Sequence, residues 1–248
     1  MSESYLYIHL ETVTNMILSY GISMNDFVDA FKQVPEHLLL LSDVDENEMI
    51  DPHTGFNVIS GREDILRYLL NPKISRKKWI DYKHTLYLDE ITPFEVSELL
   101  YLGHAYTHLS SPFYYKLANQ YVYLELPNEM TKVYYRHLED FHRVLSNTIT
   151  RYFEAHNFQA NFLFKRHVIH YVNLDNQTLN AIHELLVDGV LFDFTAAFRQ
   201  DDQLIVPLFQ LKHRFVPNDI AWSMTSAEKL GTLEYNREVQ QWAVKLQA

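Results

Sequence analysis

The sequence contains no cysteine and only 6 glycines and 8 prolines among its 248 residues. The absence of cysteine excludes disulfide bonds, iron–sulfur clusters, thiolate zinc sites and a cysteine nucleophile. The few glycines and prolines form no biased tract, which argues against a collagen-like or disordered chain. Because 47% of the residues are hydrophobic and 14% are aromatic, the chain has enough apolar material for a buried core.

Long hydrophobic runs are also missing. Runs such as Leu38 to Leu41 are far shorter than the roughly 20 residues that cross a bilayer. The beginning of the chain, MSESYLYIHLETV, lacks the basic start and apolar stretch of a secretory signal. We therefore expect a soluble, cytoplasmic protein without a membrane partner.

Positive charge is scarce in the first quarter of the chain. Residues 1–60 hold ten acidic residues and one basic residue, Lys32, so this part carries most of the net charge of −11. Such a segment repels a phosphate backbone, which disfavours nucleic acid as a partner.

One basic cluster stands against this acidic background. It consists of Lys73, Arg76, Lys77, Lys78 and Lys83, with Trp79 and Tyr82 interleaved. Cations beside aromatic rings are typical of single-stranded nucleic-acid grooves, where rings stack on bases. The same residues also suit a solvated helix face that packs its Trp inward, or a docking surface for the acidic first quarter. We therefore treat the cluster as a candidate partner-binding site, with a nucleic-acid-associated regulator as one alternative.

The first 60 residues are predicted to form short helices. Val13, Ile17 and Leu18 recur at helical spacing, and Pro35 can open a further helix over residues 35–41. The polar stretch 42–61 then separates these helices from the next element. The sequence therefore predicts an acidic, mainly helical N-terminal subdomain over 1–60 and a second part over 61–248, which can also form one continuous domain.

Helices and strands alternate in the remainder. Capping signals predict helices that begin after Ser60 and after Thr92, and an apolar repeat predicts a long helix from Leu138 to Tyr152. Asp175 is predicted to cap a helix that stops at Gly189. Strands are predicted by three regions rich in aromatic and branched residues, namely 113–136, 161–173 and 190–215. The expected fold class is α+β, a largely antiparallel sheet with packed helices, preceded by the helical N-terminal part.

Two histidines give the sharpest chemical signal. His104 and His108 are four residues apart on the predicted helix, so both rings lie on one face and can present two nitrogens to a metal ion. The zinc-protease pattern is incomplete, because position 105 is Ala where that pattern has its Glu. The sequence requires no cofactor, but this pair predicts a divalent metal in a metal-dependent hydrolase. A third ligand is expected among the following side chains: His137, Asp140, His142, His167, His170 and His183.

Tyrosine is abundant, with 17 residues in the chain, and several lie between Tyr101 and Tyr123. Tyrosine suits both sheet packing and binding surfaces, because it combines a large apolar ring with a polar tip. Complete nucleophile and phosphate-binding motifs are missing. The leading functional hypothesis is therefore a binding or regulatory module, with a protein partner or a second copy of the chain as possible partners.

Overall fold

The computed structural model describes residues 4–41, 49–105, 111–156 and 171–247, which form two compact units. Unit 1 comprises Met1–Leu10, Ser19–Asp26 and His142–Ala248, and unit 2 comprises Glu11–Leu18 and Phe27–Phe141. The chain therefore passes repeatedly from one unit to the other. The subdomain boundary expected near residue 60 stays a prediction.

The expected fold class is wrong in its N-terminal part, because the chain begins with strands. Tyr5–Glu11 forms β1 and Met16–Tyr20 forms β2. Leu6, Ile8 and Leu10 are buried at a period of two, which is the period of a strand and not of a helix. The helix expected over 35–41 is also absent, since this stretch holds a buried strand. The described residues contain thirteen strands in all, and their registered pairs are antiparallel.

Unit 1 places its strands in the order β13-β12-β11-β9-β1, with β10 paired to β11. Long helix α4 and helix α5 pack in this unit, and α5 is capped at Asp175, whose side chain accepts a hydrogen bond from the backbone N–H of Thr178. Strand β2 begins in unit 2 and ends in unit 1. The elements that follow in unit 1 are α4 (Leu138–Ala155, which begins in unit 2), α5 (Asn176–Leu186), β9 (Val190–Asp193), β10 (Phe198–Gln200), β11 (Gln203–Leu211), α6 (Ile220–Thr225), β12 (Ala227–Asn236) and β13 (Gln241–Leu246). Short 3-10 turn η2 (Pro217–Asp219) precedes α6.

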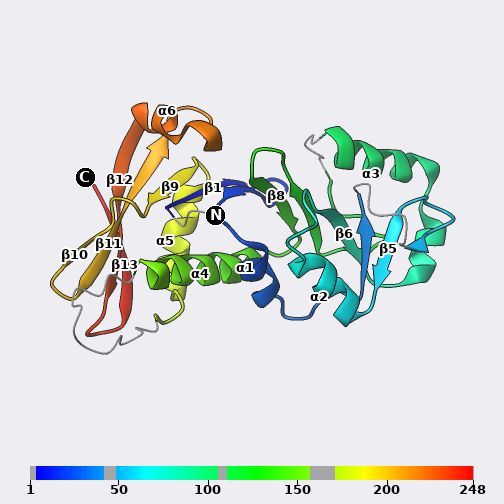
Figure 1. Cartoon of the computed structure of the whole chain (residues 1–248), viewed down its shortest axis with the longest axis horizontal. Coiled ribbons are helices and arrows are strands. Elements are labelled where there is room, and N and C mark those ends of the chain that lie inside the picture. Colours follow the sequence, from blue (N-terminus) through cyan, green and yellow to red (C-terminus); the bar gives the residue numbers. More distant parts are fainter. Residues whose placement is uncertain (1–3, 42–48, 106–110, 157–170, 248) are drawn as a thin grey trace. The chain divides into compact units, whose positions relative to one another are not determined.

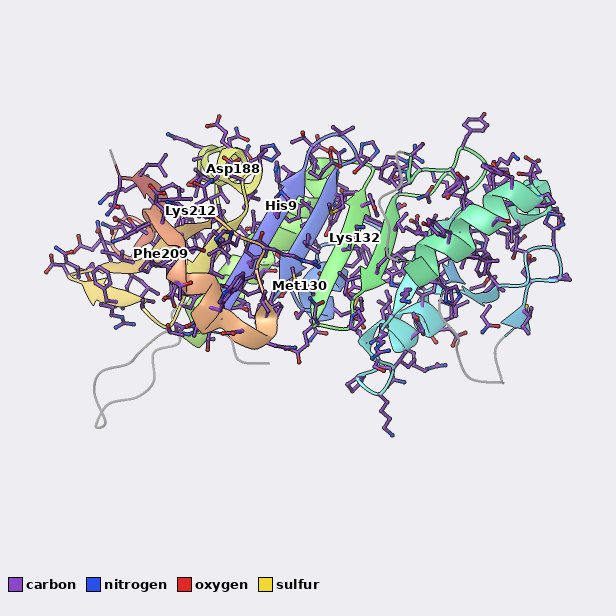
Figure 2. All side chains as sticks on the ribbon, turned by 90° about the horizontal axis from the view of Figure 1, so that it is seen from above. His9, Met130, Lys132, Asp188, Phe209 and Lys212 are labelled. Atoms are coloured by element: carbon purple, nitrogen blue, oxygen red, sulfur yellow. The ribbon has the colours of Figure 1, made fainter. Side chains whose placement is uncertain are left out.

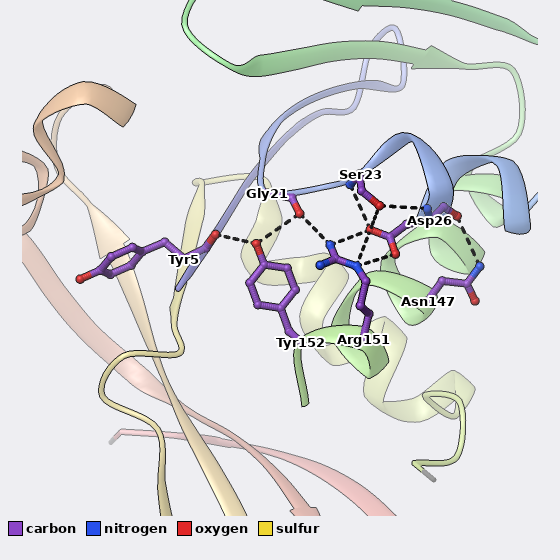
Figure 3. A network of polar contacts seen from close by, with 7 residues as sticks. All are labelled: Tyr5, Gly21, Ser23, Asp26, Asn147, Arg151 and Tyr152. Carbon is purple, nitrogen blue, oxygen red and sulfur yellow. Dashed lines mark hydrogen bonds and ion pairs between the residues drawn. The ribbon is translucent and has the colours of Figure 1, made fainter. Parts of the chain in front are cut away.

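A polar network fixes α4 against the N-terminal segment of unit 1 (Figure 3). The Arg151 guanidinium donates to both carboxylate oxygens of Asp26, at 2.8 to 3.1 Å, and to the carbonyl oxygen of Gly21 at 3.0 Å. Ser23 donates to the same carboxylate from its hydroxyl and its N–H. The side chain of Asp26 is only 5% exposed, so its charge depends on these donors.

Unit 2 places its strands in the order β8-β7-β6-β3-β5-β4. Side chains alternate between the two faces of these strands. One face belongs to a core that contains Ile80 and Tyr134, and the other carries Trp79, whose ring stacks on that of Tyr123. Lys132 lies on β8, two residues after Met130 (Figure 2). The elements are α1 (Met24–Asp29, which begins in unit 1), β3 (His37–Leu40), β4 (Met49–Ile50), β5 (Asn57–Ser60), α2 (Arg62–Leu70), β6 (Lys78–Tyr82), η1 (Thr85–Glu90), α3 (Pro93–Ala105), β7 (Tyr121–Glu125) and β8 (Met130–Tyr135).

Helices cover both faces of the unit 2 strands. Leu99 and Leu102 of α3 join the core on one face. On the other face, Phe27 packs edge-on against Trp79. Figure 1 shows α3 and α2 on opposite sides of β5 and β6. Because α3 packs on the strands through one side, its other side is left for contacts with solvent or a partner.

Candidate interaction surface

Helix α3 begins where the sequence predicts, through a reciprocal cap. The Thr92 hydroxyl and N–H both donate to the Glu95 carboxylate at 2.7 Å, and the Glu95 N–H points back to the Thr92 hydroxyl at 3.3 Å. This capping box satisfies backbone groups that a helix start otherwise leaves unpaired. The observed helix ends at Ala105, and residues 106–110 lie outside the described part.

The inner side of α3 is held close to the strands at Gly103. A side-chain carbon at this position would lie 2.5 Å from the carbonyl oxygen of Leu41, so only glycine allows the observed approach. The carbonyl oxygen of Gly103 also accepts a hydrogen bond from the Lys78 ammonium at 2.5 Å. This anchoring fixes which side of the helix faces away from the strands.

The outer side of α3 carries large apolar side chains. Phe94 is 71% exposed and Tyr101 is 58% exposed, and their spacing of seven residues places both on one face. Leu100 and His104 are also exposed beside them. A helix that is apolar on both its inner and outer sides is typical of one that is covered on both sides.

A neighbouring loop adds a third aromatic ring. Tyr115 is 97% exposed, and the next residue, Lys116, forms an ion pair with Glu95 in the first turn of α3 at 2.7 Å. This ion pair ties the loop to the first turn of α3. We define the α3 surface as Phe94, Leu100, Tyr101 and Tyr115.

Acidic residues are frequent in the segment that carries the α3 surface. The sequence from His84 to Tyr115 contains four acidic residues and no lysine or arginine. Asp89 and Glu90 are exposed, and Glu98 is half-buried. The α3 surface therefore combines exposed aromatic rings with negative charge.

The predicted metal ligands are only partly described. His104 lies on the outer side of α3, whereas His108 lies outside the described residues. Of the candidate third ligands, His142 and His183 meet in unit 1, with 3.2 Å between Nε2 and Nδ1. Asp140 accepts a hydrogen bond from the Tyr121 hydroxyl. In the part of the chain that the structure describes, no group of three or more His, Asp or Glu side chains is placed to hold an ion. A metal bound by His104 and His108 stays a prediction.

The basic cluster divides into an exposed and a buried part. Lys73, Arg76 and Lys83 are exposed, whereas the Lys77 ammonium donates to two backbone carbonyl oxygens at 2.8 and 2.9 Å. Lys78 bonds Gly103, and Trp79 is fully buried. Partner binding by this cluster stays a prediction, and Lys73, Arg76 and Lys83 are the members that face solvent. Trp79 is buried because every residue of strand β6 is buried, and one of the alternatives above places this Trp on a helix.

Comparisons with known proteins give no further guide: no family model, no curated protein and no solved structure matches this chain. Among the described residues, no helix has the length and apolar character needed to cross a membrane. The function therefore has to be argued from the side chains. The sequence indicated the tyrosines of this region as candidate surface residues but did not indicate Phe94. Phe94 lies in the first turn of a helix, and its position there does not reveal which side of the helix packs on the strands.

Proposed function

We propose that this protein is a binding module that docks a basic, amphipathic helical segment of a partner protein on the α3 surface. The observation that carries the proposal is the exposure of Phe94, Tyr101 and Tyr115 in a stretch, residues 84–115, that holds four acidic residues and no lysine or arginine. The adjoining Lys116 is paired with Glu95. Exposed aromatic side chains are enriched at the centres of protein interfaces, where their burial supplies much of the affinity.

Charge supports the choice of a basic partner. Asp89, Glu90 and Glu98 border the apolar side chains, so a partner with lysines or arginines beside its own apolar stripe complements both features. The same charges oppose a second copy of the chain, because a symmetric contact through this surface would bring two acidic borders together. An amphipathic helix is favoured because its side chains at intervals of three and four residues can contact both Phe94 and Tyr101.

The test uses three fluorescent 18-residue peptides and fluorescence anisotropy. The first is an amphipathic helix of leucine and lysine, the second has the same composition in scrambled order, and the third has glutamate in place of lysine. We expect the first peptide to bind most tightly. The scrambled peptide controls for general attraction of cations to a protein with a net charge of −11.

Variants then locate the binding site. Phe94→Ser and Tyr101→Ser should each weaken binding by at least about 10-fold, which corresponds to about 1.4 kcal/mol. Val239→Ser is the matched control, because Val239 is 58% exposed, as Tyr101 is, and lies in unit 1. Equal binding of the scrambled peptide, or equal loss of binding in Val239→Ser, would refute the proposal. So would preferential binding of the acidic peptide or of single-stranded DNA.

A further inference from the structure

Three side chains form a row across adjacent strands of unit 2. His37 on β3 lies opposite Ser60 on β5 and opposite Tyr82 on β6. The Ser60 hydroxyl is 2.8 Å from His37 Nδ1, and the imidazole ring stacks on the Tyr82 ring with 5.0 Å between centroids. Register and stacking therefore hold the imidazole in place beside the hydroxyl.

The position of Ser60 differs from the one that its sequence motif predicts. Ser60 and Glu63 match a capping box, but the structure contradicts that cap: Gly61 is the N-cap residue of α2, and no side chain caps the helix start. Gly61 has a φ of 93°, a conformation that glycine adopts without strain. Strand β5 thus turns sharply into α2, and the Ser60 hydroxyl is exposed and directed to His37 instead of α2.

We propose that Ser60 and His37 are a nucleophile–base pair that hydrolyses small, uncharged carboxylic esters. Ser60 Oγ attacks the ester carbonyl carbon while His37 Nδ1 takes the hydroxyl proton. The carbon–oxygen bond to the alcohol then breaks, His37 returns the proton to the leaving oxygen, and an acyl-Ser60 remains. Water then attacks the acyl carbon while His37 takes its proton. The bond between the acyl carbon and Ser60 Oγ breaks, His37 returns the proton to Oγ, and the carboxylic acid leaves. This activity is independent of partner binding at the α3 surface.

The surroundings of the pair supply the other requirements. Partial burial lowers the pKa of His37, and nearby His84 acts in the same direction while Glu36 opposes it. The imidazole is therefore largely neutral at pH 7 and can accept a proton. The first N–H groups of α2, which follow Ser60 in the chain, have no partner within the helix, and they would stabilise negative charge on a substrate oxygen that lies near them.

The acidic residues near the pair set the substrate class. Glu63 and Asp64 lie in the exposed first turn of α2, and Glu36 precedes His37. These carboxylates repel phosphate esters and other anionic substrates. Since Ser60 is exposed at the end of a strand, the pair favours a small ester that needs no deep pocket.

The experiment combines chemical labelling with turnover. The full-length protein is treated with a fluorophosphonate probe, the modified peptide is identified by mass spectrometry, and p-nitrophenyl acetate hydrolysis is followed from pH 5 to pH 9. We expect the probe to label Ser60 in the unmodified protein and to label no residue of the Ser60→Ala variant. The rate of ester hydrolysis should rise with pH as His37 loses its proton. His37→Gln should lower the rate by at least about 100-fold, which is the lower end of a general-base contribution. Ser111→Ala, which changes another exposed serine, should match the unmodified protein.

The outcomes separate a catalytic pair from a structural contact. If the Ser60–His37 hydrogen bond only joins β3 to β5, the probe should not label Ser60, or His37→Gln should leave labelling and turnover unchanged. Either result would overturn the proposal. Peptide mapping of the unmodified protein decides the question even where a variant folds poorly. Circular dichroism of Ser60→Ala and His37→Gln shows that a lost rate reflects chemistry and not unfolding. Hydrolysis that is faster for an anionic ester than for p-nitrophenyl acetate would overturn the assigned substrate class.

Discussion

Replacing Arg151 by methionine should destabilise unit 1 strongly. The substitution keeps much of the side-chain length but removes the donors to both oxygens of Asp26 and to the Gly21 carbonyl. Loss of one partner of a buried ion pair costs about 3–5 kcal/mol, because the remaining charge is left without compensation. Since the Arg151 side chain is 29% exposed, water can replace part of its contribution, and we expect the lower end, about 3 kcal/mol.

Urea unfolding followed by circular dichroism measures this loss, and hydrogen exchange with mass spectrometry shows whether it is confined to unit 1. Arg67→Met is the control, because the Arg67–Asp64 pair is exposed on both sides and should contribute at most about 1 kcal/mol. Adding Asp26→Asn to Arg151→Met should recover part of the stability by removing the uncompensated charge. The reasoning is refuted by an Arg151→Met variant no less stable than Arg67→Met, or by a double variant that recovers nothing.

Three further substitutions test other features of unit 2. Gly103→Ala should lower the free energy of unfolding by about 1–3 kcal/mol, because its methyl group collides with the Leu41 carbonyl. The control, Ser97→Ala, should change the free energy of unfolding little in the same urea titration. Equal stability of the two variants contradicts the close approach at Gly103. Burial raises the pKa of Asp81 to about 7 although its carboxylate accepts N–H bonds from Gln120 and Tyr121. The folded protein thus prefers the protonated form of Asp81, so its stability should fall as pH rises from about 4 to 7. Urea titrations at several pH values should show a weaker fall in Asp81→Asn. An unchanged pH profile in this variant would refute the raised pKa of Asp81. Burial lowers the pKa of Lys132 to about 8, so stability should rise between pH 8 and 10.5, and this rise should be absent in Lys132→Met.

The helices with complete local signals could be predicted from the sequence. The apolar repeat that begins at Leu138 predicts α4, and the Asp175 cap with Gly189 predicts the ends of α5. The Thr92 and Glu95 pair likewise predicts the start of α3. In each case, residues close in sequence determine the structure, so the pattern needs no information about tertiary contacts.

The N-terminal strands could not be predicted in the same way. Val13, Ile17 and Leu18 share a helical spacing, but Val13 is 87% exposed beyond the end of β1 and Ile17 is buried in β2. One of the two neighbours of β1 is β9, with Tyr5 opposite Asp193, so these stabilising contacts come from residues almost two hundred positions away. Local propensity cannot report such pairing.

The candidate sites show the same division. Capping and spacing predicted that His104 lies on a helix, and it lies exposed near the end of α3. The row of Ser60, His37 and Tyr82 depends on the register of three strands. The local motif instead predicted that Ser60 caps the helix that follows it. A paired hydroxyl and imidazole of this kind becomes visible only when the strand order is known.

The interleaved course of the chain has a consequence for synthesis on the ribosome. All segments of unit 2 lie within residues 11–141, whereas unit 1 joins residues near the N-terminus to strands that end at Leu246. All strands that lie wholly in unit 2 have therefore been synthesised while the C-terminal third of the chain is still being made. The N-terminal residues of β1 must wait for β9, so unit 1 closes late and its rate of formation is limited by contacts of long sequence separation.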